Sequence, residues 1–363
     1  MRTPLYTWHR SHGAKIVPFA GWDMPLHYHT GALEEHHLVR RSVGLFDISH
    51  MGRLIFRGPD AAGELDRLIS SDVLGLPEGN STYGLLCRED GTVIDDVFTY
   101  RFSDSYLVVV NAANRDRDVS WISNHIHDSV DWSDESESLS MIALQGPAAI
   151  GMADELSEHS ATRIPRFGCA MITLAGYTMR VGRTGYTGED GLELFPESSD
   201  VEAVWDTFFE HAGANQIDLG PCGLAARDSL RFEPGFHLYG HELHDNITPV
   251  EARLKWACNL ERDFIGRDAI VERAGQGPQR RLATVVMRDK GVPRQAYTVT
   301  DAAGNSIGEV ASGMLAPTVG EYAANVFVDT AWSKVGTHLA VEIRGREKLA
   351  EVVKRPLYKP RYK

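Results

Sequence analysis

Apolar and polar residues alternate along the chain in a way that predicts both strands and helices. Short β-favouring runs predict strands, and apolar residues repeated every three or four positions predict helices. Strands are predicted at residues 53–57, 82–87, 93–102, 106–110 and 139–144, and helices at 59–69 and 114–126. This order is that of a split β-α-β unit, so residues 53–145 predict one antiparallel sheet backed by two helices.

The segments on either side of this unit are less regular. Residues 19–28 mix aromatic residues with Gly and Pro, which predicts an ordered loop, and a helix is predicted from Ala32 with Gly44 as its C-terminal stop. Further along, strands are predicted at 169–174 and 177–181, and helices at 201–209, ended by Gly213, and at 224–232.

The last part of the chain has a different pattern. Residues 274–281 are rich in Gly and Gln and form the best linker candidate. Beyond them, short predicted strands are separated by turns at 282–287, 297–300, 306–310, 323–328 and 339–343. This pattern predicts a small all-β barrel or sandwich of roughly 80 residues, and an α+β fold for the whole chain.

Two adjacent carboxylates, Asp95 and Asp96, interrupt one of the apolar strands. They point to opposite faces, and neither face is otherwise polar. The aspartate that faces the core must accept hydrogen bonds from nearby donors or line a pocket. The spacing fits equally well a solvated pair beside the hairpin turn predicted at Asp90 and Gly91.

A second unusual stretch, residues 182–191, has glycine at every third position. It matches neither a dinucleotide fingerprint nor a P-loop, but it indicates backbone with positive φ or close approach to another group. Tyr186 lies within it and Glu193 just beyond. The alternative for this stretch is a simple surface connection. In the helix predicted at 224–232, Arg227 and Arg231 likewise fit ordinary ion pairs on the helix surface.

Composition limits the classes of function. The chain has 363 residues, enough for two or three domains, and a net charge of −13 from 37 basic and 50 acidic residues without a basic block. Nucleic acid is therefore not an expected partner. The four cysteines are far apart, which predicts neither disulfides nor a thiolate zinc site. Without a signal peptide or an apolar run of membrane-spanning length, we expect a cytoplasmic protein without membrane contacts.

Histidines concentrate near the N-terminus and suggest a metal only weakly. No His-Glu-x-x-His motif occurs, and His241 and His244 have a different spacing. Solvated or hydrogen-bonded imidazoles explain these histidines, so no metal is expected.

Motifs along nearly the whole chain resemble those of the T-protein of the glycine cleavage system, a family of tetrahydrofolate-dependent aminomethyltransferases. They are found at residues 3–6, 19–22, 46–52, 94–96, 111–114, 145–147, 183–191, 223–231 and 238–240. So many ordered matches are specific where a single tripeptide is not.

The resemblance implies a cloverleaf of three subdomains around a central folate site. The first comprises residues 1–52 and 146–273, the second residues 53–145, and the C-terminal barrel residues 282–363. It also implies the reaction: a one-carbon unit passes from the aminomethyl-lipoyl arm of a partner H-protein to tetrahydrofolate, releasing ammonia, methylenetetrahydrofolate and dihydrolipoyl H-protein.

The resemblance also assigns residues. Asp96 matches the catalytic aspartate of the family, which stabilises a cationic carbon and orients or deprotonates the attacking nitrogen. Glu193 matches the carboxylate that accepts hydrogen bonds from the N–H donors of the pterin. Asp95 is expected to be structural. The other expected folate-site residues are Tyr83, Tyr100 and Tyr186 as aromatic walls, Met51 with Leu54 or Ile55 as an apolar side, Arg227 as a partner for the folate tail or Asp96, and Asn111.

Two related functions remain as alternatives. One is a folate-dependent demethylase of N-methyl or S-methyl compounds, and the other a non-catalytic folate-binding protein. The chain lacks the fused flavin domain of some demethylases and the cysteine-containing signature of the binding proteins. Departures from the T-protein pattern occur at His241 and at 316–320.

Overall fold

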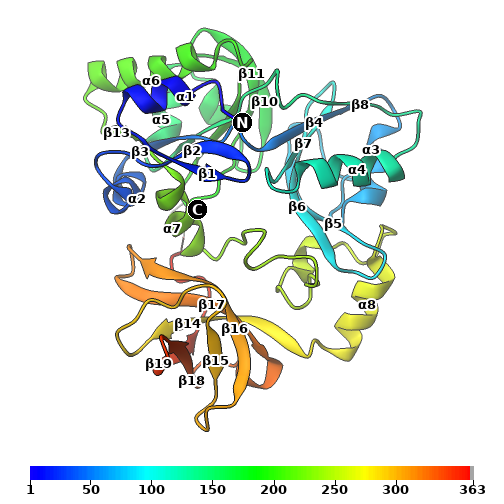
Figure 1. Ribbon diagram of the computed structural model, residues 1–363. Helices are drawn as coiled ribbons and strands as arrows, with labels where there is room; N and C mark the ends of the chain where they lie inside the picture. The colour runs from blue at the N-terminus through cyan, green and yellow to red at the C-terminus, as the bar shows by residue number, and fades with distance from the viewer. Residues whose placement is uncertain (360–363) are drawn as a thin grey trace.

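The computed structural model describes residues 1–359, which form three lobes (Figure 1). The first lobe has a six-stranded sheet in the order β10-β11-β12-β9-β3-β13. Its strands are β3 (Val43–Asp47), β9 (Ile142–Gln145), β10 (Cys169–Leu174), β11 (Tyr177–Gly182), β12 (Gly191–Phe195) and β13 (Leu219–Pro221). The same lobe holds the hairpin β1 (Lys15–Phe19) and β2 (Trp22–His27), and the helices α1 (Tyr6–Ser11), α2 (Ala32–Arg41), α5 (Ala149–Glu155), α6 (Val201–Asn215) and α7 (Leu224–Phe232).

The second lobe is an antiparallel five-stranded sheet in the order β5-β6-β7-β4-β8. It contains β4 (Gly52–Arg57), β5 (Ser81–Cys87), β6 (Val93–Arg101), β7 (Tyr106–Val110), β8 (Asp131–Asp134), α3 (Ala61–Leu68) and α4 (Arg115–His125). The hairpin turn predicted at Asp90 and Gly91 is confirmed between β5 and β6, and β6 forms a second hairpin with β7.

The strand predicted at residues 139–144 was assigned to the wrong sheet. It corresponds to β9, whose four residues are all buried between β3 and β12 of the first lobe. The second sheet is completed instead by β8, which pairs with β4 and is an Asp-Trp-Ser-Asp segment without an apolar pattern. An apolar run shows that a strand is buried, but it does not identify the sheet that buries it.

The third lobe is a closed barrel, which confirms the C-terminal prediction and, with the two sheets, the α+β class. Its strands are β14 (Arg280–Met287), β15 (Thr298–Thr300), β16 (Ser306–Ala316), β17 (Glu321–Asp329), β18 (His338–Ile343) and β19 (Arg346–Val353). Strand β19 was not predicted, because it begins with three charged residues, Arg346, Glu347 and Lys348. The end of the predicted 282–363 domain, residues 360–363, lies outside the described residues.

Several predicted boundaries were wrong for local reasons. Residues 19–28 are mostly a hairpin, whose turn places Ala20 and Gly21 at positive φ. Gly44 does not stop α2 but lies in β3, where a Cβ would collide with Val39 and Cys222. Helix α6 runs through Gly213 to Asn215, and the next residue, Gln216, caps it in the left-handed conformation. The predicted linker is shorter, because α8 (Arg267–Gln276) occupies its first part.

Packing brings the three lobes together. A shared core joins Phe46 and Phe195 of the first sheet to Ile55 and Leu107 of the second. Helix α7 lies between the first lobe and the barrel (Figure 1), and it contacts both β2 and β16. The three lobes therefore meet around α7 and the edge of the second sheet.

Candidate active site

A cavity of about 990 Å³ lies at this meeting point. It is lined by the first two lobes, by the segments after α7, and by Arg355 and Pro356 after β19. The residues predicted for the site that line it are Met51, Tyr83, Asp96, Asn111, Tyr186, Glu193 and Arg227. Leu54 and Ile55 do not line it, because both belong to fully buried cores.

Asp96 is held at the cavity wall by one donor from the neighbouring strand β5 and one from the loop after β7. Its Oδ2 accepts a hydrogen bond from the Tyr83 hydroxyl at 3.1 Å, and its Oδ1 from Asn111 Nδ2 at 2.8 Å. Burial and the negative charge of Asp95 nevertheless raise the pKa of Asp96 to about 7. This carboxyl can therefore both hold and release a proton near neutral pH.

Asp95 faces away from the cavity and is fully buried. It accepts hydrogen bonds from the backbone N–H and Nδ2 of Asn111, both at 2.9 Å, and from Asn114 Nδ2 at 2.5 Å. The reading of the two aspartates as a solvated pair is therefore wrong. Asn111 links them, since its amide contacts both carboxylates.

The carboxylate of Glu193, on β12, is held in place by two hydrogen bonds. Its Oε2 accepts hydrogen bonds from the Tyr100 hydroxyl at 2.5 Å and from Thr184 Oγ1 at 2.6 Å. Tyr100 is fully buried and does not line the cavity, so its expected role as an aromatic wall is corrected. Within residues 1–359 both donors of Glu193 reach Oε2, which leaves Oε1 for a ligand.

Arg227 and Tyr186 form another part of the wall. The Arg227 guanidinium lies 4.8 Å from the centre of the Tyr186 ring, and the Tyr186 hydroxyl donates to the carbonyl of His237. In the described part of the chain, Nη1 of Arg227 is buried without a hydrogen-bond partner, and no hydrogen bond joins Arg227 to Asp96. A buried guanidinium with an unused N–H favours an acceptor on a ligand.

The turn that carries Met51 is anchored by Arg53, which the sequence reading missed. Arg53 is fully buried and donates to the carbonyls of Ser49, Met51 and Ser136. An arginine inside an apolar strand was the available signal. The same turn brings His50 to the cavity, where burial and Arg227 lower the imidazole pKa to about 3, so the ring is neutral.

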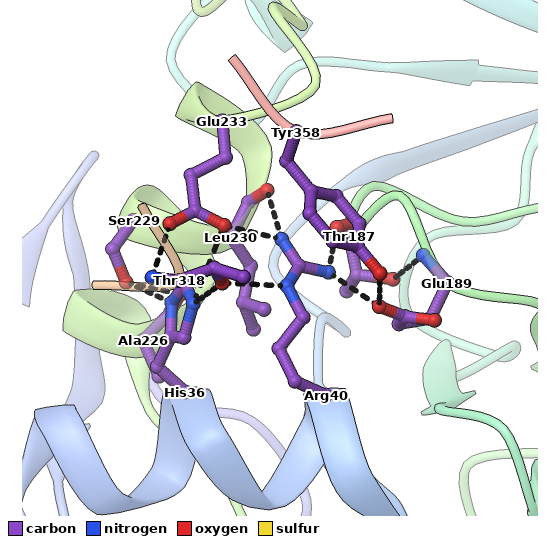
Figure 2. Close-up of polar contacts among 10 residues, drawn as sticks. All are labelled: His36, Arg40, Thr187, Glu189, Ala226, Ser229, Leu230, Glu233, Thr318 and Tyr358. Atoms are coloured by element: carbon purple, nitrogen blue, oxygen red, sulfur yellow. Dashed lines mark hydrogen bonds and ion pairs between the residues drawn. The ribbon is translucent and has the colours of Figure 1, made fainter. Parts of the chain in front are cut away.

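The glycine-rich loop is held by a cluster of buried polar side chains (Figure 2). Arg40 of α2 donates to the Thr187 carbonyl and Glu189 Oε1 at 2.8 and 2.9 Å, and to Glu233 Oε2 at 2.8 Å. Tyr358 stacks on Arg40 and donates to Glu189 at 2.6 Å. The loop that presents Tyr186 is therefore tied to α2, α7 and the C-terminal segment.

Two features are absent from residues 1–359. No group of three or more His, Cys, Asp or Glu side chains has an arrangement that would hold a metal ion. No helix in this range combines the length and apolar character needed to span a lipid bilayer.

Comparison with known proteins gives a consistent result. Residues 5–262 match the family described as GCVT N-terminal domain, and residues 280–359 the glycine cleavage T-protein C-terminal barrel domain. The chain is 41% identical to an aminomethyltransferase of Herpetosiphon aurantiacus over 100% of this chain and 99% of the relative. It is 43% identical to the aminomethyltransferase of Symbiobacterium thermophilum, with 99% and 97% covered.

A solved structure is similar over the full length. It is the glycine cleavage system aminomethyltransferase T from Bartonella henselae, which is 31% identical with a TM-score of 0.93. The similarity covers 100% of this chain and 99% of that structure. The arrangement of the three lobes is therefore shared between the two proteins.

Proposed function

The chain belongs to the glycine cleavage T-protein family of aminomethyltransferases, as its motifs indicated, and we propose that it transfers a one-carbon unit from aminomethyl-lipoyl H-protein to tetrahydrofolate. The products are methylenetetrahydrofolate, ammonia and dihydrolipoyl H-protein. Full-length similarity at about 40% identity supports the reaction class, and the cavity supports the choice of acceptor.

One observation carries the proposal: two carboxylates, Asp96 and Glu193, line a single cavity and are each held by protein donors. The unused Oε1 of Glu193 suits the adjacent N–H donors of a reduced pterin. The unpaired Nη1 of Arg227 suits an acceptor on the same ligand, such as a carboxylate of the folate tail. The polar groups of the wall thus fit tetrahydrofolate.

The remaining residues divide the chemistry. Bound tetrahydrofolate supplies the nitrogen nucleophile. Asp96 stabilises positive charge at the carbon being transferred and accepts the proton that the nucleophile loses, which its pKa of about 7 allows at neutral pH. Tyr83 and Asn111 orient Asp96, while Met51 and Tyr186 provide the walls against which the ligand packs.

The test is a transfer assay with aminomethyl-loaded H-protein and tetrahydrofolate, in which ammonia and methylenetetrahydrofolate are both measured. We expect release of both products in equal amounts and only in the presence of both substrates. Ammonia release no faster than without the protein would reject the proposal. Demethylation of an N-methyl or S-methyl compound in place of this transfer would favour the demethylase alternative.

A further inference from the structure

Behind the cavity wall, two buried carboxyl groups face each other. Asp118 of α4 and Asp95 of β6 are both fully buried. Within residues 1–359, neither oxygen of Asp118 receives a hydrogen bond from a donor group, and its polar neighbour is the Asp95 carboxyl. Two buried carboxylates in contact cannot both be ionised, so the pair must hold a proton between them.

The surroundings decide which carboxyl holds that proton. Asp95 accepts three hydrogen bonds from Asn111 and Asn114, all of which favour its charged form. Asp118 has no such donors, and burial together with Asp95 raises its pKa to about 11. The proton therefore resides on Asp118, whose O–H donates to Asp95.

The charged and titratable groups around the pair leave this assignment unchanged. Arg117 on α4 favours an ionised Asp118, but its guanidinium is bound to Asp245 at 2.7 Å and to the carbonyl of Ile94. Asp96 on β6 adds negative charge and favours the protonated form. Tyr83 of β5 is neutral, because burial and Asp96 raise its pKa well above the ordinary value, and its hydroxyl donates to Asp96.

We propose that Asp118 is a positioning residue for the transfer reaction: it remains protonated at neutral pH, donates to Asp95, and so keeps Asp95 ionised next to Asp96. This inference rests on the proposed function, because it assigns a purpose to the protonation state of Asp96. The ionised Asp95 repels negative charge on Asp96 and makes Asp96 a stronger proton acceptor, and Asn111 fixes the distance between the two. Asp118 touches neither substrate.

The direct test observes protonation in the ligand-free protein by carbon NMR with aspartate labelled at the carboxyl carbon. In the wild-type protein, one aspartate signal should stay in its protonated position from about pH 6 to 9, and it should disappear in Asp118→Asn. The Asp96 signal, assigned with Asp96→Asn, should titrate near pH 7. Absence of any aspartate signal that stays protonated up to about pH 9 would overturn the proposal, whatever the variants do.

Two substitutions at Asp118 separate positioning from charge. Asp118→Asn keeps a donor toward Asp95, so the Asp96 midpoint should stay within about 0.3 units. Asp118→Leu fills the space but offers Asp95 no hydrogen-bond donor, so Asp95 takes up a proton itself. A neutral Asp95 no longer repels negative charge on Asp96, and the midpoint of the Asp96 titration should fall by about one pH unit. The same shift should appear in the pH profile of transfer. Asp116→Asn, on the exposed side of α4, is the matched control and should change neither the Asp96 midpoint nor the pH profile of transfer.

The outcomes keep the two proposals apart. If Asp118→Asn lowers the Asp96 midpoint as much as Asp118→Leu, then Asp118 is ionised in the wild-type protein and the inference is wrong. If the NMR results are as expected but the transfer assay shows no ammonia release, the proposed function fails while the proton assignment holds.

Discussion

The hydroxyl of Tyr100 lies 2.5 Å from Oε2 of Glu193 and joins the second sheet to the first at the back of the cavity. Tyr100 belongs to β6 and Glu193 to β12, so one hydrogen bond crosses between strands of different lobes. Burial and the Glu193 charge raise the pKa of Tyr100 well above its ordinary value, which keeps the hydroxyl protonated as a donor. The position of Glu193 therefore depends on a residue that does not itself line the cavity.

Replacing Tyr100 by phenylalanine tests this relationship. A hydrogen bond to a charged group contributes about 1.5–3 kcal/mol, and Thr184 remains as a second donor. We expect Tyr100→Phe to weaken tetrahydrofolate binding by roughly tenfold in titration calorimetry. Tyr322→Phe, on the barrel surface, is the control. Equal affinities for the two variants would show that Tyr100 does not support the ligand site.

Strand alternation explains both what the sequence predicted and what it missed here. Asp96, Phe98 and Tyr100 share one face of β6, and the first two line the cavity as that pattern suggests. Tyr100 does not, because the first sheet covers this end of the strand, where Gly182 lies against the tyrosine ring. The face of a side chain follows from the sequence, but the covering of that face is decided by a distant segment.

The same distinction applies to the fold. Helix α7 and most barrel strands were predicted because their apolar periodicity is strong. Strand β8 was missed because three of its four residues are polar, and β19 because it begins with three charged residues; they form through pairing with β4 and with β14 and β18. Asn111 could be predicted only from its motif, whereas its bridge between Asp95 and Asp96 required the geometry of the loop after β7.

Glu193→Gln tests the carboxylate itself. The amide keeps the shape of the side chain but removes the charge that favours two ligand donors. We expect tetrahydrofolate to bind roughly 10–100-fold more weakly, the loss of a charge-assisted hydrogen bond. Glu197→Gln, just beyond β12 and exposed, should bind like the wild-type protein in the same calorimetric titration. Unchanged affinity in Glu193→Gln would remove this residue from the proposed folate site.

Asp96→Asn separates binding from chemistry. The amide cannot accept a proton, so product formation should fall at least about 100-fold while tetrahydrofolate affinity changes by less than about threefold. In the wild-type protein kcat/KM should rise with pH around 7, as Asp96 loses its proton. The residual kcat/KM of the variant should not show this rise with pH. Wild-type turnover in Asp96→Asn would exclude Asp96 from the mechanism.

The same substitution should stabilise the protein at alkaline pH. The folded state holds the Asp96 proton up to about pH 7, whereas the unfolded chain releases it near pH 4. The folded state therefore binds more protons in this interval, and the contribution of Asp96 to stability falls as pH rises through it. Asp96→Asn should gain about 1 kcal/mol or more at pH 8 and nothing at pH 4. Thermal unfolding of both proteins at both pH values measures this difference, and an equal gain at the two values would contradict it.

Glu233→Gln tests the cluster that supports the glycine-rich loop. Glu233 is fully buried, and although burial disfavours its charge, His36, Thr318 and Arg40 lower its pKa to about 2. Its stabilisation is therefore present above about pH 4 and lost as pH falls toward 2. At pH 7, Glu233→Gln should cost about 3 kcal/mol in urea unfolding, because a buried ion pair loses one partner. Glu351→Gln, in an exposed pair, should cost at most about 1 kcal/mol. Equal costs would mean that the cluster contributes no more than a surface contact.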